Sequence, residues 1–82
     1  MTYQVRTIKK FDKSFKKLDR QSQKLIKNWM DGNLIGCQDP RFYGKALTGN
    51  FKGIWGYRIG AYRLLAKIDD DKLIIFFIDR RN

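Results

Sequence analysis

The sequence has 82 residues and a mass of 9.8 kDa, which allows one domain over residues 1–82. Hydrophobic residues make up 43% of the chain, so it can close one compact core and intrinsic disorder is excluded. Eighteen lysines and arginines against eight acids give a net charge of +10, which indicates a polyanionic partner.

Two residue types that many enzymes depend on are absent. The chain has no His and no Glu, and all eight acids are Asp. Catalytic triads with His and His-ligated metal sites are therefore excluded, and we expect neither a metal nor a cofactor. The single cysteine, Cys37, cannot form an internal disulfide, and no apolar stretch is long enough to span a bilayer. We therefore expect a cytoplasmic protein with no membrane partner.

The first half of the chain predicts a strand followed by two helices. Apolar and polar residues alternate over residues 3–6, as in a short strand with one buried face. Residues 8–19 have the apolar spacing of an amphipathic helix with a basic outer face, set by Phe11, Phe15 and Leu18. Asp19 is placed to N-cap a second helix, and Gly32 offers its C-terminal stop. These two helices should form a hairpin.

The second half predicts an irregular connection and then three antiparallel strands. Residues 33–51 show no sustained period, whereas residues 53–59, 62–68 and 72–78 are rich in strand-forming residues and bounded by turns. Gly60 and Ala61 fit a two-residue type II′ turn, and Asp69 to Asp71 supply the next turn. We expect an α+β fold in which the N-terminal strand and the helix hairpin pack on a twisted antiparallel sheet of about four strands.

The Gly60-Ala61 turn sets which residues face each other across the first hairpin. Arg58 falls opposite Arg63, on one face of the sheet. The other face is apolar and can cover the helices; it comprises Trp55, Tyr57, Ile59, Tyr62, Leu64, Ala66 and Ile68. The arginines should therefore lie side by side on the face that the helices leave open.

Two like charges at this separation repel each other. At ~6 Å the repulsion is about 0.7 kcal/mol in water and about 3 kcal/mol at an effective dielectric of 20. A phosphate between the two guanidinium groups would reverse the sign. The surrounding window, residues 40–68, has no acid and contains Arg41, Lys45, Lys52, Arg58, Arg63 and Lys67. This window predicts a phosphate-binding surface.

Three segments closely resemble the RelE/ParE superfamily of type II toxin–antitoxin toxins, on the RelE side. The N-terminal one is Lys10-Phe11-x-Lys13-x-Phe15-x-Lys17-Leu18. The others are Gly44-Lys45-x-Leu47-x-Gly49 and Gly53-x-Trp55-x-Tyr57-Arg58-Ile59-Gly60-x-Tyr62-Arg63-Leu64-Leu65. The resemblance covers nearly the whole chain and implies a toxin that cuts mRNA on the ribosome, inhibits translation and is silenced by a cognate antitoxin protein.

The resemblance also implies a site made of basic residues. Arg63 would stabilise the pentavalent phosphorane, Arg58 would contact phosphate, and Lys52 or Lys45 would serve as the base. The implied catalytic set is Lys52, Arg58, Arg63 and Arg81, and the implied RNA-binding set is Lys45, Lys67, Arg80 and Arg41. A three-residue turn at residues 69–71 would place Arg81 on the arginine face, and a two-residue turn would favour Arg80.

The C-terminal segment departs from the family pattern, so three functions remain open. Family members usually continue past the last strand with a basic, His-containing segment and a Tyr, whereas this sequence closes on Asp79-Arg80-Arg81-Asn82, a shortened C-terminus without either residue. The three functions are an mRNA endoribonuclease with weakened activity, a catalytically inactive relative that binds antitoxin or RNA, and a ParE-like gyrase inhibitor. The Gly-x-Tyr-Arg-Leu strand and the arginine pair argue against the third, and the mRNA endoribonuclease is the leading hypothesis.

Overall fold

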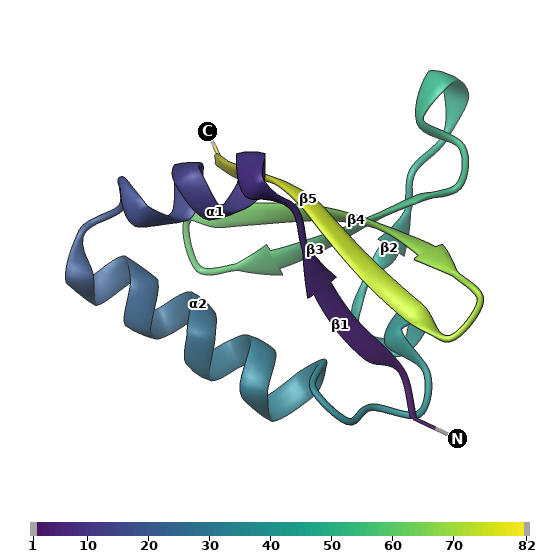
Figure 1. Cartoon of the computed structure of the whole chain (residues 1–82). Helices are drawn as coiled ribbons and strands as arrows, with labels where there is room; N and C mark the ends of the chain where they lie inside the picture. Colours follow the sequence, from purple (N-terminus) through teal and green to yellow (C-terminus); the bar gives the residue numbers. More distant parts are fainter. Residues whose placement is uncertain (1, 82) are drawn as a thin grey trace.

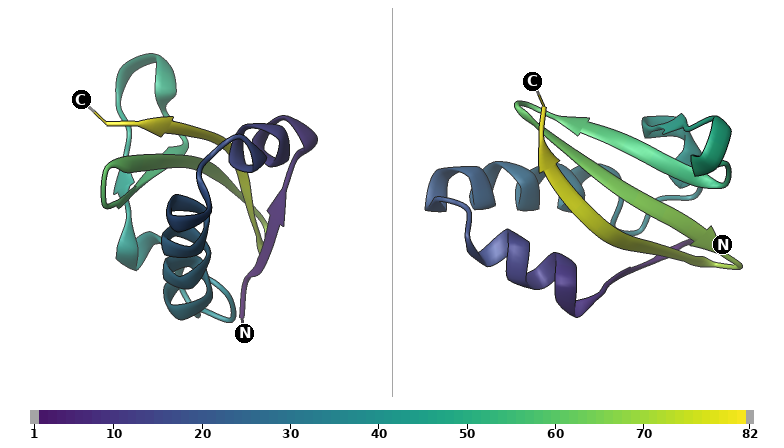
Figure 2. Two further views of the ribbon diagram at one scale, coloured as in Figure 1. Left: turned by 90° about the vertical axis from the view of Figure 1, so that its left-hand side faces the viewer. Right: turned by 90° about the horizontal axis from the view of Figure 1, so that it is seen from above.

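Two helices cover one side of a five-stranded sheet (Figures 1 and 2). The computed structural model describes residues 2–81, with only the backbone of Phe51. The elements in chain order are β1 (Gln4–Thr7), α1 (Lys9–Lys16), α2 (Arg20–Asn33), the 3₁₀ turn η1 (Pro40–Tyr43), β2 (Lys45–Ala46), the 3₁₀ turn η2 (Gly49–Phe51), β3 (Ile54–Ile59), β4 (Tyr62–Asp69) and β5 (Lys72–Arg80).

The sheet has the order β1-β5-β4-β3-β2 and is mixed. The predicted α+β class and the antiparallel run β3-β4-β5 are confirmed, but β1 pairs parallel with β5 at one edge. β1 can lie parallel because the two helices carry the chain back before the meander begins. The expected count of about four omitted β2, which spans two residues and is too short to show a period.

The predicted helices are both present, with the C-terminal end of each corrected. The first was expected over residues 8–19, but α1 ends at Lys16, where the amide of Lys17 donates a hydrogen bond to the Ser14 carbonyl and closes the last turn. Asp19 is the N-cap residue of α2, and its carboxylate accepts a hydrogen bond from the Ser22 hydroxyl, which lowers the pKa of Asp19. The predicted stop at Gly32 is wrong, because α2 continues to Asn33. The Asn33 side-chain amide donates to the Trp29 carbonyl at 2.8 Å, so the last turn keeps a satisfied acceptor.

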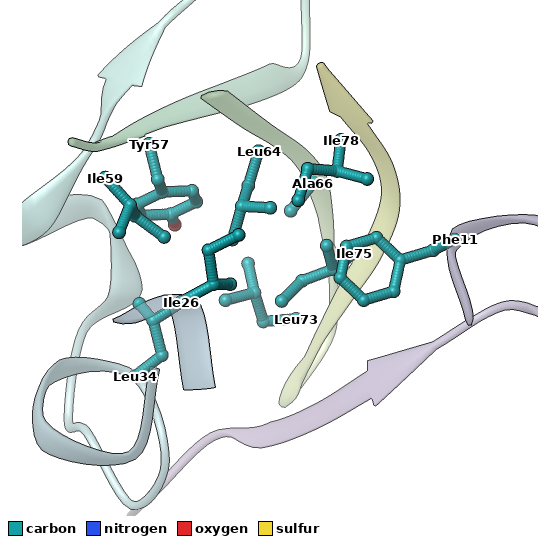
Figure 3. Packing of buried hydrophobic residues seen from close by; sticks show 10 residues of the cluster. All are labelled: Phe11, Ile26, Leu34, Tyr57, Ile59, Leu64, Ala66, Leu73, Ile75 and Ile78. Atoms are coloured by element: carbon teal, nitrogen blue, oxygen red, sulfur yellow. The ribbon is translucent and has the colours of Figure 1, made fainter. Parts of the chain in front are cut away.

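The core lies between the helices and the sheet (Figure 3). Phe11 comes from α1 and Ile26 from α2, and Leu34 follows directly after that helix. The strands contribute Tyr57, Ile59, Leu64, Ala66, Leu73, Ile75 and Ile78. Burying one large aliphatic side chain contributes about 1.5–3 kcal/mol, so this layer holds the sheet against the helices. The opposite face of β3, β4 and β5 remains available for function.

Candidate functional site

The β3–β4 hairpin has the predicted register. Ile59 pairs with Tyr62 and Arg58 with Arg63, and Gly60 takes the positive φ of 55° that the turn needs. Because neighbouring strand residues alternate between faces, the burial of Tyr57 against the helices places Arg58 on the open face. The two guanidinium groups therefore project from the same exposed surface, as predicted.

The β4–β5 turn has two residues, but a β-bulge further along the ladder changes which arginine reaches the arginine face. Asp69 pairs with Lys72, and Asp70 between them adopts a φ of 58°. A two-residue turn alone favours Arg80 on the arginine face. However, the register shifts between Leu65 and Ala66, so that the end of β5 is offset by one residue.

The bulge places Asp79 directly opposite Arg63. Alternation then brings Arg81, two residues further, to the arginine face, and puts Arg80 opposite Tyr62 on the helix side. The Arg81 guanidinium donates to the Gly60 carbonyl at 3.0 Å, and the Arg81 amide donates to the Ala61 carbonyl at 2.6 Å. Arg81 is thereby held against the turn that joins β3 to β4.

Asp79 lies beside Arg63 in the site, and the sequence did not predict this contact. Its Oδ2 lies 3.8 Å from Nη2 of Arg63, and both side chains are about half exposed (51% and 48%). A long ion pair in this much solvent is weak, so a phosphate can displace it. Among the described residues, no carboxylate lies within ion-pair distance of Arg58.

Two adjoining hollows share the arginine pair. The first, of about 460 Å³, is lined by Phe42, Tyr43, Gly44, Lys45, Leu47, Gly56, Arg58 and Arg63. The second, of about 330 Å³, is lined by Arg58, Arg63, Asp79, Arg80 and Arg81. Arg58 and Arg63 therefore stand between an aromatic hollow and a strongly cationic one. We call this combined region the arginine surface.

Lys45 is the lysine that the structure brings to the arginine pair. It pairs with Gly56 across β2 and β3, and Arg58 is two residues along β3 on the same face. Such diagonal neighbours lie about 7–8 Å apart, within reach of a lysine side chain. Gly56 has no side chain of its own between them, and the space above it is bordered by Leu47 and Leu65.

Three of the predicted site residues line neither hollow. Lys52 lies in the loop between η2 and β3. Lys67 shares the face of Arg63 but is four residues along β4, about 13 Å away. Arg41 forms an ion pair with Asp39 at 3.1 Å, one residue outside the acid-free window. The structure therefore groups Lys45, Arg58, Arg63 and Arg81, with Arg80 at the border of the second hollow, and separates Lys52, Lys67 and Arg41 from them.

Phe42 and Tyr43 line the first hollow and were not predicted as site residues. Phe42 is 82% exposed and Tyr43 is 43% exposed, and their rings pack edge to face with centroids 5.1 Å apart. The only sequence signal was a pair of aromatic residues between Pro40 and Gly44 in an otherwise irregular segment. Their position beside Arg58 depends on the path of that segment in space.

Tyr57, which is buried on the helix side of the sheet, holds the η1 segment in place. Its hydroxyl donates to the Pro40 carbonyl at 2.8 Å, and burial raises the pKa of Tyr57 well above its ordinary value. Gly44 lies against the same ring, since a Cβ there would come within 2.7 Å of Cε1 of Tyr57. The η1 segment is thus attached to the residue that precedes Arg58.

In residues 2–81, no helix is both long enough and apolar enough to cross a bilayer. The fold is that of a small α+β protein of the RelE type. Over 99% of its length the chain matches, with a TM-score of 0.87 and 29% identity, 100% of a chain in the toxin–antitoxin complex RelBE2 from Mycobacterium tuberculosis. The chain thus has the structure of the RelE toxins across its full length, and the predicted resemblance is confirmed.

More distant solved structures share the fold. The RelE–RelB complex from Pyrococcus horikoshii matches at 20% identity, with a TM-score of 0.73 and coverage of 100% of this chain and 98% of that one. The isolated RelE toxin from Escherichia coli matches at 14% identity and a TM-score of 0.74, with 99% of this chain and 86% of that one covered. No family model and no curated protein matches the sequence.

Proposed function

We propose that the protein is the toxin of a type II toxin–antitoxin system and cleaves mRNA on the ribosome, thereby inhibiting translation. The observation that supports this most is the Arg58–Arg63 pair, exposed between two hollows that can accept the RNA on either side. Arg63 and Arg58 provide fork-shaped donors that match the oxygens of a phosphate.

The cleavage needs no cofactor. The 2′ oxygen attacks the adjacent phosphorus, a 2′-O–P bond forms and the P–O5′ bond breaks, which leaves a 2′,3′-cyclic phosphate and a 5′-hydroxyl. Arg58 and Arg63 stabilise the charge on the non-bridging oxygens of the phosphorane. The leaving 5′ oxygen takes a proton from water. The ribosome contributes by holding the strand with the 2′ hydroxyl aligned for attack.

Lys45 is our candidate for the base that takes the proton from the 2′ hydroxyl. It lines the same hollow as Arg58 and Arg63, whereas Lys52, the other candidate, does not. Arg81 binds a neighbouring phosphate from the second hollow. Arg80 borders the same hollow and adds positive charge there, and Lys67 and Arg41 contribute longer-range attraction for the RNA backbone.

The partners follow from the same proposal. Four of the matched solved structures are complexes of a toxin with an antitoxin, and a chain of net charge +10 suits a partner with acidic segments. We propose a cytoplasmic location, where ribosomes and antitoxin are both found. The Asp79–Arg63 ion pair favours a weakened activity, since the phosphate has to displace a carboxylate.

Cleavage on translating ribosomes tests the proposal. New mRNA 5′ ends, mapped by primer extension, should appear with the purified protein and decrease about 10²- to 10³-fold with Arg63→Ala, as expected when one charge-stabilising group is lost. Lys27→Ala is the matched control, because it removes one positive charge from the exposed side of α2. Protection of RNA without new ends would instead identify a non-catalytic binding protein. Inhibition of purified gyrase without cleavage would identify a ParE-like toxin.

A further inference from the structure

We propose that Phe42, supported by Tyr43, is a stacking platform for one unpaired base of a single-stranded RNA whose phosphate lies on Arg58 and Arg63. This inference rests on the proposed function only in taking RNA as the ligand. It adds a base-binding position to a surface that otherwise contacts phosphates.

The first observation is exposure. Phe42 is 82% exposed at the edge of the first hollow, although burying a large apolar side chain is favourable. The Tyr43 ring packs against it in a T-shaped pair with an interplanar angle of 77°, so Phe42 has an aromatic neighbour and still stays largely exposed. A flat ligand can therefore stack on it.

The second observation is the attachment of the platform. Pro40 is buried and its carbonyl accepts the Tyr57 hydroxyl, while Gly44 lies against the Tyr57 ring at the other end of η1. The four residues of η1 are thus held at both ends by one buried side chain. Little conformational freedom is lost when a ligand stacks on a segment that is already fixed.

The third observation is charge, which selects the ligand. Lys45, Arg58 and Arg63 line the same hollow as the two aromatic rings. A groove that combines cations with an exposed aromatic ring suits a polyanion that also has flat apolar faces, which describes single-stranded nucleic acid. An apolar peptide would offer no negative charge to the three cations of this hollow.

The two hollows therefore have different roles. The second hollow is lined by four arginines and one aspartate and has no aromatic residue among its lining side chains. A nucleotide there is held through its phosphate, whereas the nucleotide beside Phe42 is held through its base as well. The RNA should consequently have a base contact on only one side of the phosphate that lies on Arg58 and Arg63.

An abasic scan measures this contact without cleavage. The probe is a short single-stranded RNA with 2′-O-methyl groups, which cannot be cleaved by 2′ attack, and its affinity is measured by fluorescence anisotropy. Removing one base at a time should reveal one position where the wild-type protein loses about 5- to 150-fold in affinity. With Phe42→Ala this position-specific loss should disappear, and with Phe42→Trp it should persist.

Phe77→Ala is the matched control, because Phe77 is also an exposed aromatic residue on the open face but lines neither hollow. It should keep the full abasic loss. Equal losses in the wild type and in Phe42→Ala overturn the inference, and so does the absence of RNA binding. Weaker antitoxin binding by Phe42→Ala with unchanged RNA affinity would assign the ring to a protein contact and also overturns it. If the abasic result holds while ribosomes are not cleaved, the platform stands and the nuclease proposal fails.

Discussion

The two faces of the β3-β4-β5 meander differ sharply although the same strands make both. The face toward the helices buries Tyr57, Ile59 and Leu64 almost completely. The other face exposes Arg58, Arg63 and Asp79 only one residue away along each strand. Side chains alternate between the two faces along each strand, so the same strands serve stability and binding separately. One face is packed against the helices, and the other keeps charged side chains in water, where no cost of burial arises.

This difference implies that substitutions on the two faces have separable effects. A change on the helix side should alter the free energy of unfolding, and a change on the open side should alter RNA binding or cleavage. The link between them is Tyr57, which is buried beneath the sheet but holds the segment that contains Phe42.

The largest expected effect is on the helix side. Ile75 is 0% exposed, and Ile75→Ala should lower the free energy of unfolding by about 2–5 kcal/mol, because it removes buried methyl groups and leaves a cavity. Denaturant unfolding measures this. The control is Phe77→Ala on the open face, which should cost less than about 1 kcal/mol. Equal costs would show that the two faces are not separated in the way described.

The next effect concerns Tyr57. Tyr57→Phe should cost about 1–3 kcal/mol at neutral pH, because the buried Pro40 carbonyl loses its donor. The folded pKa of Tyr57 is raised, so above pH 10 the unfolded state loses this proton first and the wild type loses stability, by about 1.4 kcal/mol per pH unit.

The stability difference between wild type and Tyr57→Phe should therefore be constant below pH 10 and shrink above it. Thermal or denaturant unfolding from pH 8 to pH 11 measures it. Tyr43→Phe is the control, because it removes the same hydroxyl from an exposed tyrosine. A difference that stays constant up to pH 11 would contradict the role of the buried hydroxyl.

The smallest expected effect is on RNA binding by the open face. Asp79→Asn removes the carboxylate 3.8 Å from Arg63 and should tighten RNA binding about 2- to 5-fold at low salt, in line with a weak exposed ion pair. Asp31→Asn on α2 makes the same change in net charge and should have a smaller effect. Binding that weakens with Asp79→Asn would show that the carboxylate positions Arg63 rather than competing with the phosphate.

Much of the arginine surface could be predicted because its first hairpin is local. Gly60 and Ala61 define a two-residue turn, and the turn sets every pair from Ile59 and Tyr62 outward. Lys45 was among the predicted RNA-binding residues but could not be ranked above Lys52. Its neighbourhood depends on β2, whose two residues have no recognisable pattern.

The amino-acid sequence by itself determined the helix hairpin, the strand meander and the pairing of Arg58 with Arg63, because short-range periodicity and turn chemistry are sufficient for each. Tertiary structure alone decided that Asp79 faces Arg63, that Arg81 rather than Arg80 shares their face, and that Phe42 stands beside them. A bulge and an irregular loop adopt their geometry from the packing of distant segments, here the long β4–β5 ladder and the Tyr57–Pro40 contact, so no local pattern encodes them.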